Sequence, residues 1–173
     1  HSVNTVDYAH HEIHSGDMFR VQANTNAGST LIIAFKVPNQ EKQPHFIWEW
    51  NSQSSGYMQL VEGYTWTAGT GSDVAPKNSN RNFTKTSVLQ GNATGLFVSG
   101  YVVENPTGGS GGTVISDKRV YQSDTNQSAG GGGGSRRSEI VLATNQTYAL
   151  IWTSTDGDKG IQLRCEWYEH APK

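Results

Sequence analysis

The chain has 173 residues, a mass of 18.8 kDa, a formal net charge of −2 and one cysteine. This length suits one domain with its own hydrophobic core, so we expect a single domain over residues 1–173. The lone cysteine excludes an internal disulfide framework. The lack of a basic surplus argues against general nucleic-acid binding, and no apolar run reaches the length of a membrane-spanning helix. We therefore expect no nucleic-acid partner and no membrane partner.

Apolar and polar residues alternate with period two along much of the chain, which is typical of half-buried antiparallel strands. We expect strands over 18–23, 31–37, 46–50, 58–61, 96–103, 148–153 and 160–168, and a weaker one over 83–89. Turns rich in Gly, Asn and Ser separate these runs, and no stretch supplies crossover helices. The pattern predicts an all-β fold, an antiparallel β-sandwich of jelly-roll type. Its core should include Trp48, Trp50, Leu150, Trp152, Leu163 and Trp167.

Two segments fall outside this pattern. Residues 1–15 form a polar lead-in, and we expect no helix there because Ser15 and Gly16 precede the first strand. Residues 106–138 form a glycine-rich insertion, whose flanks 106–112 and 129–135 should be flexible. The insertion is either a long surface loop with one loose hairpin or an arm that becomes ordered on a partner.

The arm hypothesis depends on the residues between the two glycine tracts. A spacer without contacts has no need of aliphatic or aromatic side chains, whereas an arm that pairs with a sheet edge would use them. A compact basic pair follows the second tract and would contact an acidic partner. These candidate interface residues are Val114, Ile115, Arg119, Tyr121, Arg136 and Arg137.

A second candidate interface is the polar turn at residues 78–82. Three asparagines and one arginine in five residues supply many hydrogen-bond donors and acceptors. The alternative is a set of Asx-turns that only satisfy the local backbone. The residues concerned are Asn78, Asn80, Arg81 and Asn82.

The densest titratable cluster comprises His10, His11, Glu12 and His14. The zinc-protease motif fails, because Ser15 stands where its second histidine is needed. His10 and His14 would share one side of a helix, but we expect no helix here. On an extended chain His10, Glu12 and His14 would share a face, yet a locally hydrogen-bonded polar lead-in is the better interpretation. We predict no metal site and no bound cofactor.

Other catalytic signatures are weak. Cys165 alternates with apolar residues on the inner face of the last strand, so we interpret it as a core residue and not as a nucleophile. Glu49 lies between two tryptophans, and a glycosidase would need a second carboxylate, such as that of Glu62, Glu166 or Glu169. Tryptophan faces also stack on sugars, so a carbohydrate-binding module remains an alternative. We predict no catalytic residues and no enzyme.

Short motifs spread in order along the chain resemble a family of small head proteins of tailed bacteriophages. The opening HEIHSGDMF at 11–19 is similar to that family's H-x-x-H-S-G-x-x-F, and NRN at 80–82 is similar to its polar turn. Further similarities are LVEG at 60–63, EIVL at 139–142, NQTY at 145–148 and WYEH at 167–170. The insertion is longer and richer in glycine than the resemblance leads one to expect.

This family resembles capsid decoration or cement proteins. The resemblance implies a non-enzymatic β-sandwich on the outer capsid surface of the virion, bound to the major capsid protein and bracing it. It also implies self-association, with a trimer favoured because cyclic symmetry matches local three-fold positions of an icosahedral shell. The alternative is a carbohydrate- or receptor-binding β-sandwich of a phage fibre or a cell-surface protein. A small glycosidase or metal-dependent enzyme ranks third.

Overall fold

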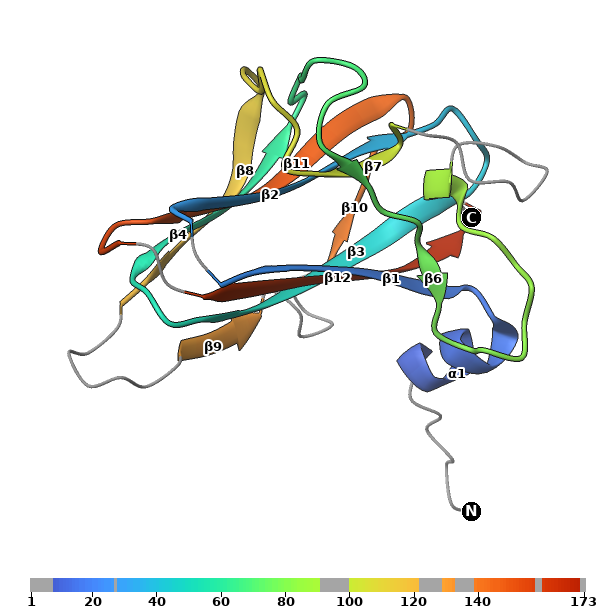
Figure 1. Ribbon diagram of the computed structural model, residues 1–173. Helices are drawn as coiled ribbons and strands as arrows, with labels where there is room; N and C mark the ends of the chain where they lie inside the picture. Colours follow the sequence, from blue (N-terminus) through green and yellow to red (C-terminus); the bar gives the residue numbers. More distant parts are fainter. Residues whose placement is uncertain are drawn as a thin grey trace.

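The computed structural model describes residues 8–26, 28–90, 100–121, 129–132, 139–157 and 160–171. Two antiparallel sheets lie face to face in these residues, with one short α-helix at the amino-terminal end (Figure 1). The predicted all-β sandwich is therefore confirmed.

The first sheet is built around β12, which pairs along its whole length with β3 on one side and along most of it with β1 on the other. Cys165 of β12, for example, lies between Val21 of β1 and Trp48 of β3. In order, its strands are β10 (Ile140–Val141), β3 (Gln43–Ser52), β12 (Ile161–His170), β1 (Met18–Thr25) and β6 (Lys77–Asn78), and β9 (Ala129–Gly132) also pairs with β3.

The second sheet repeats this arrangement around β11, which lies between β2 and β4. In order, its strands are β5 (Ser72–Asp73), β7 (Val102–Glu104), β2 (Thr30–Val37), β11 (Gln146–Ser154), β4 (Gly56–Glu62) and β8 (Thr113–Val120). The terminal strands of this sheet, β5 and β8, therefore each have only one described neighbour.

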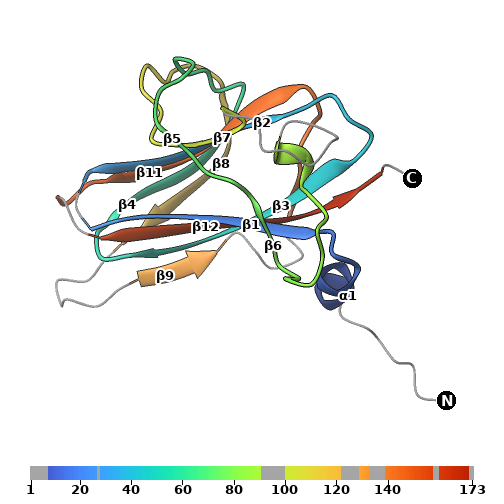
Figure 2. The same ribbon diagram turned by 45° about the vertical axis from the view of Figure 1, so that its right-hand side comes forward.

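The connectivity is that of a jelly roll. The chain alternates between the two sheets from β1 through β2 and β3 to β4, and it crosses again between β11 and β12 (Figure 2). In both sheets a strand from the carboxyl-terminal part lies between two strands from the amino-terminal part, as β1-β12-β3 and β2-β11-β4. This strand order is typical of a jelly roll, in which an antiparallel pair of long chain segments folds into two Greek keys.

Aromatic rings hold the two sheets together. Tyr148 and Phe35 of the second sheet stack at 5.7 Å between ring centroids, and Phe35 lies 5.0 Å from Phe46 of the first sheet. Phe46 in turn lies 6.1 Å from Trp48 and 6.4 Å from Trp167. Ring pairs at such distances contribute beyond the apolar area that they bury.

Five of the six predicted core residues are fully buried, and the sixth is partly buried and packs against them. The fully buried ones are Trp48, Leu150, Trp152, Leu163 and Trp167. The partly buried one is Trp50, and Lys118 of β8 lies over its ring. Alternation along the strand predicts that the Trp50 side chain lies on the inner face of the sheet, but it does not predict what fraction of that side chain the opposite sheet buries.

The expectation of a lead-in without a helix is wrong, because residues Tyr8–Ser15 form helix α1. Gly16 adopts a positive φ of 75°, its N–H donates to the Ile13 carbonyl, and the Asp17 N–H donates to the Glu12 carbonyl. These two bonds are those of a Schellman motif, in which a glycine in the left-handed region ends a helix. The Ser15-Gly16 pair is thus a stop signal for a helix and not a sign that one is missing.

Two strand predictions, the weaker one over 83–89 and the one over 96–103, also need correction. Residues 83–89 contain no strand, and Val88–Gln90 form a short 3₁₀ turn, η1, whose three side chains are buried. Of the strand predicted over 96–103, residues 96–99 lie outside the described residues, residues 100 and 101 are not in a strand, and residues 102 and 103 belong to β7 (Val102–Glu104).

The segment 106–138 is not a separate arm where the structure describes it. Thr113–Val120 form β8, which pairs with β4 of the same chain, and Ala129–Gly132 form β9, which pairs with β3. Gly112 makes the entry to β8 possible, since its φ is 86° and a Cβ there would lie 2.5 Å from the Glu62 carbonyl oxygen. The alternation was hard to see because β8 is an edge strand, with only Val120 buried.

Trp167 should be among the most costly core residues to truncate. It is 1% exposed and lies against Phe19 and Phe46. We expect Trp167→Ala to lower the free energy of unfolding by about 3–5 kcal/mol, because it leaves a large cavity. Urea unfolding followed by circular dichroism measures this, and Trp66→Ala, at a half-buried tryptophan outside the main core, is the matched control. Equal losses in the two variants would contradict the assignment.

Candidate functional site

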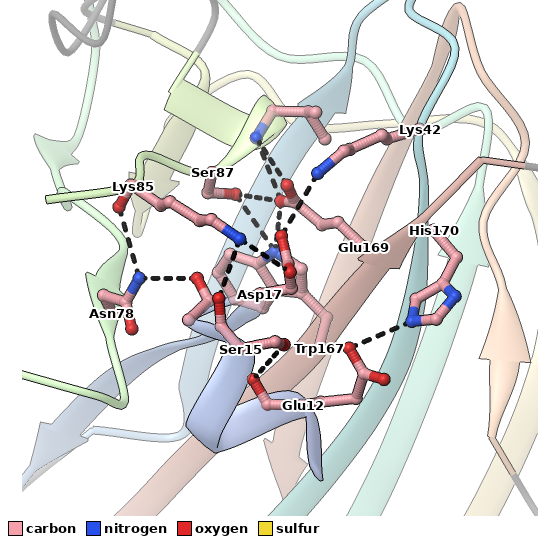
Figure 3. A network of polar contacts seen from close by, with 12 residues as sticks. Glu12, Ser15, Asp17, Lys42, Asn78, Lys85, Ser87, Trp167, Glu169 and His170 are labelled. Carbon is pink, nitrogen blue, oxygen red and sulfur yellow. Dashed lines mark hydrogen bonds and ion pairs between the residues drawn. The ribbon is translucent and has the colours of Figure 1, made fainter. Parts of the chain in front are cut away.

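The densest polar network lies where α1 meets the end of β12, and we call it the amino-terminal junction. Its charged and polar members come from α1, the connection between α1 and β1, the loops before β3 and after β6, and the last residues of β12 (Figure 3). They are Glu12, Asp17, Lys42, Lys85, Ser87, Glu169 and His170.

Glu169 is the centre of the junction, and it is 3% exposed. Its Oε1 accepts hydrogen bonds from Ser87 Oγ at 2.5 Å, from the Val88 N–H at 2.9 Å and from Trp167 Nε1 at 2.9 Å. Burial raises the pKa of Glu169, and these three donors lower it by less, so the pKa remains above the usual range. The carboxyl group thereby ties the η1 turn to β12 and to the aromatic core.

Asp17 is the second carboxylate of the junction, and its pKa is lowered whereas that of Glu169 is raised. Burial alone would raise its pKa, but Lys85 at 2.9 Å and Lys42 at 3.1 Å together hold the pKa below its ordinary value. Lys85 Nζ also donates to the Ser15 carbonyl at 2.7 Å. One lysine therefore binds both the carboxyl end of α1 and the residue that follows its cap.

Glu12 attaches α1 to the end of β12. Its side chain is buried, and Oε2 lies 3.0 Å from His170 Nε2 while Oε1 lies 3.2 Å from His11 Nδ1. His170 continues into a ring cluster, because it makes edge contacts with Tyr168 at 5.4 Å and with His45 at 5.9 Å between centroids. The junction thus uses its carboxylates to attach α1 to the sandwich, and each of them is engaged by donors of the protein.

Of the three carboxylates that could form a glycosidase pair with Glu49, Glu166 lies near it, and Glu62 and Glu169 lie elsewhere. Glu49 and Glu166 lie on the outer face of the first sheet, with Arg164 bridging them. Glu62 belongs to the other sheet and accepts a hydrogen bond from the Tyr148 hydroxyl at 2.7 Å. Glu169 is enclosed in the junction. These four carboxylates each take part in an ion pair or a hydrogen bond within the chain.

Cys165 lies in the core, as predicted. Its side chain is fully buried, and burial raises the pKa of its thiol well above the usual range. The thiol therefore lacks the exposed, electropositive surroundings that a nucleophilic cysteine requires.

The outer face of the first sheet is open and polar. Asn24 of β1, Gln162 of β12 and Asn51 of β3 are cross-strand neighbours in one row, and all three are exposed. With Gln53 they line a depression of ≈ 580 Å³ at the end of the sheet. Amide side chains offer both donors and acceptors, so this row can match the hydroxyl groups of a polar ligand.

A second, basic depression of ≈ 320 Å³ lies at the β1 edge of the same sheet. Arg20 and Lys77, which are register partners, line it together with Arg164. Arg164 is already engaged by Glu49 and Glu166, so Arg20 and Lys77 carry most of the positive character of this depression.

The third surface is the edge strand β8, which we call the β8 edge. Among the residues that the structure describes, five large apolar side chains are exposed, and three lie on or beside β8. They are Val114 at 47%, Ile115 at 39% and Tyr121 at 77% exposure. Arg119 lies over the Tyr57 ring at 5.1 Å, and Lys118 lies over Trp50 at 5.6 Å, so basic groups flank the apolar ones.

The candidate interface residues do not form one patch. Asn78 is buried, donates to the Gly16 carbonyl at 2.8 Å and accepts from the Asn80 N–H at 2.8 Å. Asn80 accepts in turn from the Asn82 N–H at 3.1 Å, so the polar turn contains the Asx-turns that the alternative interpretation described. Arg81 is exposed on the same turn.

The other candidates lie elsewhere. Val114, Ile115, Arg119 and Tyr121 belong to the β8 edge, at the end of the second sheet, whereas the polar turn follows β6 at the end of the first. The basic pair, Arg136 and Arg137, lies outside the described residues.

Sequence reasoning missed the amino-terminal junction and the amide row. Ser87 and Glu169 are 82 positions apart, and no local pattern pairs them. The alternation in β12 did indicate that Gln162, Arg164 and Glu166 share the outer face, but not which residues of β1 and β3 face them.

Comparisons of the chain with protein-family models, with curated proteins and with solved structures gave no match. In the described ranges, no helix combines the length and the apolar character needed to cross a bilayer.

The two junction carboxylates should give stability profiles of opposite sign. A carboxyl group whose pKa is raised on folding stabilises most below its unfolded pKa and loses this contribution as the pH rises. Relative to the parent, Glu169→Gln should therefore become less destabilising as the pH increases from below 4.5 toward neutrality. Urea unfolding at a series of pH values measures the difference.

Asp17→Asn is the matched comparison. Because the pKa of Asp17 is lowered on folding, its contribution is present above 3.8 and is lost as the pH falls through the folded-state pKa. Asp17→Asn should therefore become more destabilising as the pH rises over that interval. Profiles with the same sign in both variants would contradict the assigned roles.

Proposed function

We propose that this chain is a non-enzymatic structural protein of a tailed-phage virion, which binds the major capsid protein on the outer capsid surface and stabilises the shell. The ordered set of motifs that resembles phage head proteins supports the class. The single observation that carries the binding mode is the β8 edge, which has exposed apolar side chains and whose outer side pairs with no other described strand.

Edge strands of monomeric sandwiches are usually protected by charge, proline, bulges or covering loops. β8 has one register shift, between Leu60 and Val61 of its partner β4, but its outer edge pairs with no other described strand. Val114 and Ile115 are exposed beside each other near its start. A strand of a partner protein added here would gain main-chain hydrogen bonds and bury these side chains.

The charges around the β8 edge favour a partner with acidic groups. Arg119 lies over Tyr57, and the guanidinium and the ring together form a surface that a carboxylate can approach. The chain as a whole has a net charge of −2, so this attraction is local to the edge. We propose that β8 meets an edge strand or an extended arm of the capsid protein that carries acidic residues.

Such a protein stabilises the shell by mass action. A ligand that binds only the assembled capsid stabilises it by about 2.7 kcal/mol per site when its concentration is one hundred times Kd. Self-association, with a trimer favoured, would add to this effect because linked binding events raise the effective concentration at neighbouring sites.

Cosedimentation with empty shells of the major capsid protein of the same phage tests the proposal. Val114→Glu should reduce the bound fraction, since a charge replaces an apolar contact and repels acidic groups. Val141→Glu is the matched control, because Val141 is equally exposed, at 46%, but lies on β10 of the other sheet.

The outcomes separate the two parts of the proposal. Absence of parent protein from the pellet would contradict the capsid function. Equal binding of the parent and Val114→Glu, or equal loss in both variants, would contradict the β8 edge as the contact.

A carbohydrate-binding module is the second candidate, and the amide row favours it. Asn24, Gln162 and Asn51 lie side by side over three strands and open into the ≈ 580 Å³ depression. Amides that bridge neighbouring hydroxyls are a common means of orienting a sugar in an open site.

A glycan array distinguishes this candidate. Saturable binding that is lost in Asn51→Ala and retained in Gln22→Ala, an exposed position of β1 outside the row, would support it. Binding that is absent, or that is equal in both variants, would exclude the amide row as a sugar site.

A further inference from the structure

Helix α1 carries two histidines one helical turn apart on its exposed side. His10 and His14 are both exposed, and their Nε2 atoms lie 3.0 Å from each other. The ring centroids are 4.4 Å apart with an interplanar angle of 68°. Helix α1 replaces the expected non-helical lead-in and places these two histidines on one side of the helix.

We propose that His10 and His14 form a two-histidine chelate site for a divalent transition-metal ion. Two nitrogens bound to one ion at about 2.0–2.1 Å lie about 2.9 Å apart at a right angle and about 3.3 Å apart at the tetrahedral angle. The observed 3.0 Å falls between these values. The two nitrogens are therefore spaced for one ion without rearrangement of the helix.

The hydrogen bond between the rings already brings the two nitrogens together. One Nε2 donates its proton and the other accepts, and a turn of both rings about their side-chain torsions directs both nitrogens to one ion. When the ion binds, the donating ring carries its proton on Nδ1 instead, and both Nε2 lone pairs point to the metal. The proton changes place within the imidazole, and no redox step is involved.

The helix is held in place from its other side, which makes the site rigid. Glu12 bonds to His170 at 3.0 Å and is buried. Lys85 and Asn78 bind the carbonyl oxygens of Ser15 and Gly16 at 2.7 and 2.8 Å. These contacts order the backbone that carries His10 and His14 before any ion is bound, so less conformational entropy is lost on binding.

The chemistry of the donors selects the ion. Imidazole nitrogens bind copper, nickel and zinc ions well, whereas calcium and magnesium ions bind to oxygen ligands instead. No group of three or more His, Cys, Asp or Glu side chains in the described part of the chain is arranged to hold a metal. Water therefore completes the coordination, and the order of affinity should follow Cu²⁺ above Ni²⁺ and Zn²⁺.

Isothermal titration with Cu²⁺, Ni²⁺ and Zn²⁺ chlorides, in a buffer that does not chelate, tests the proposal. His10→Gln and His14→Gln should each weaken binding by about tenfold or more, equivalent to about 1.4 kcal/mol. His11→Gln is the matched control, since His11 is also exposed on α1 but points to Glu12. It should leave the affinity unchanged.

A site-specific readout accompanies the titration, because the chain has six histidines. Substoichiometric Cu²⁺ should broaden the ring resonances of His10 and His14 in the NMR spectrum before those of His11, His45 and His170. No binding of any of the three ions, binding that survives in the His10→Gln/His14→Gln double variant, or dependence on only one of the two histidines would overturn the proposal.

Discussion

The fold depends most on the position of the Trp167 side chain, which joins an apolar core to a polar network. Its rings lie against Phe19 and Phe46, and its indole N–H donates to Glu169 at 2.9 Å and to Ser87 at 3.0 Å. The chain has no disulfide to fix the two sheets. The same side chain that fills the sandwich therefore also positions the carboxylate that holds η1.

The sequence predicted the parts of the fold that depend on local alternation. The strand expected over 160–168 is β12 (Ile161–His170), and Cys165 and Trp167 lie on its buried face as expected. The order of strands within each sheet could not be predicted, because it depends on pairing between residues that are far apart, such as Met18 and Tyr168.

The errors have physical causes in particular residues. Ser15-Gly16 was interpreted as a helix breaker, although glycine in the left-handed region is also how a helix ends. β8 was interpreted as part of an insertion, because an edge strand with one buried residue shows little alternation. Among the candidate site residues, Asn80 acts within its own turn and Asn78 also binds the Gly16 carbonyl, whereas the exposed residues near β8 share one edge.

The pairing of β1 with β12 determines how the molecule responds to tension. The first residue of β1, Met18, is the partner of Tyr168 near the end of β12, and the hydrogen bonds of an antiparallel pair run perpendicular to both strands. A pulling force applied at these two points therefore breaks the hydrogen bonds between β1 and β12 one pair after another, starting at this end of the two strands. A pull along the length of β12 against β3 would instead load the ten paired positions from Ile161 to His170 together in shear. The force needed to separate the strands of the first sheet therefore depends on the direction of the pull, and it is larger along β12 than across the β1–β12 pair.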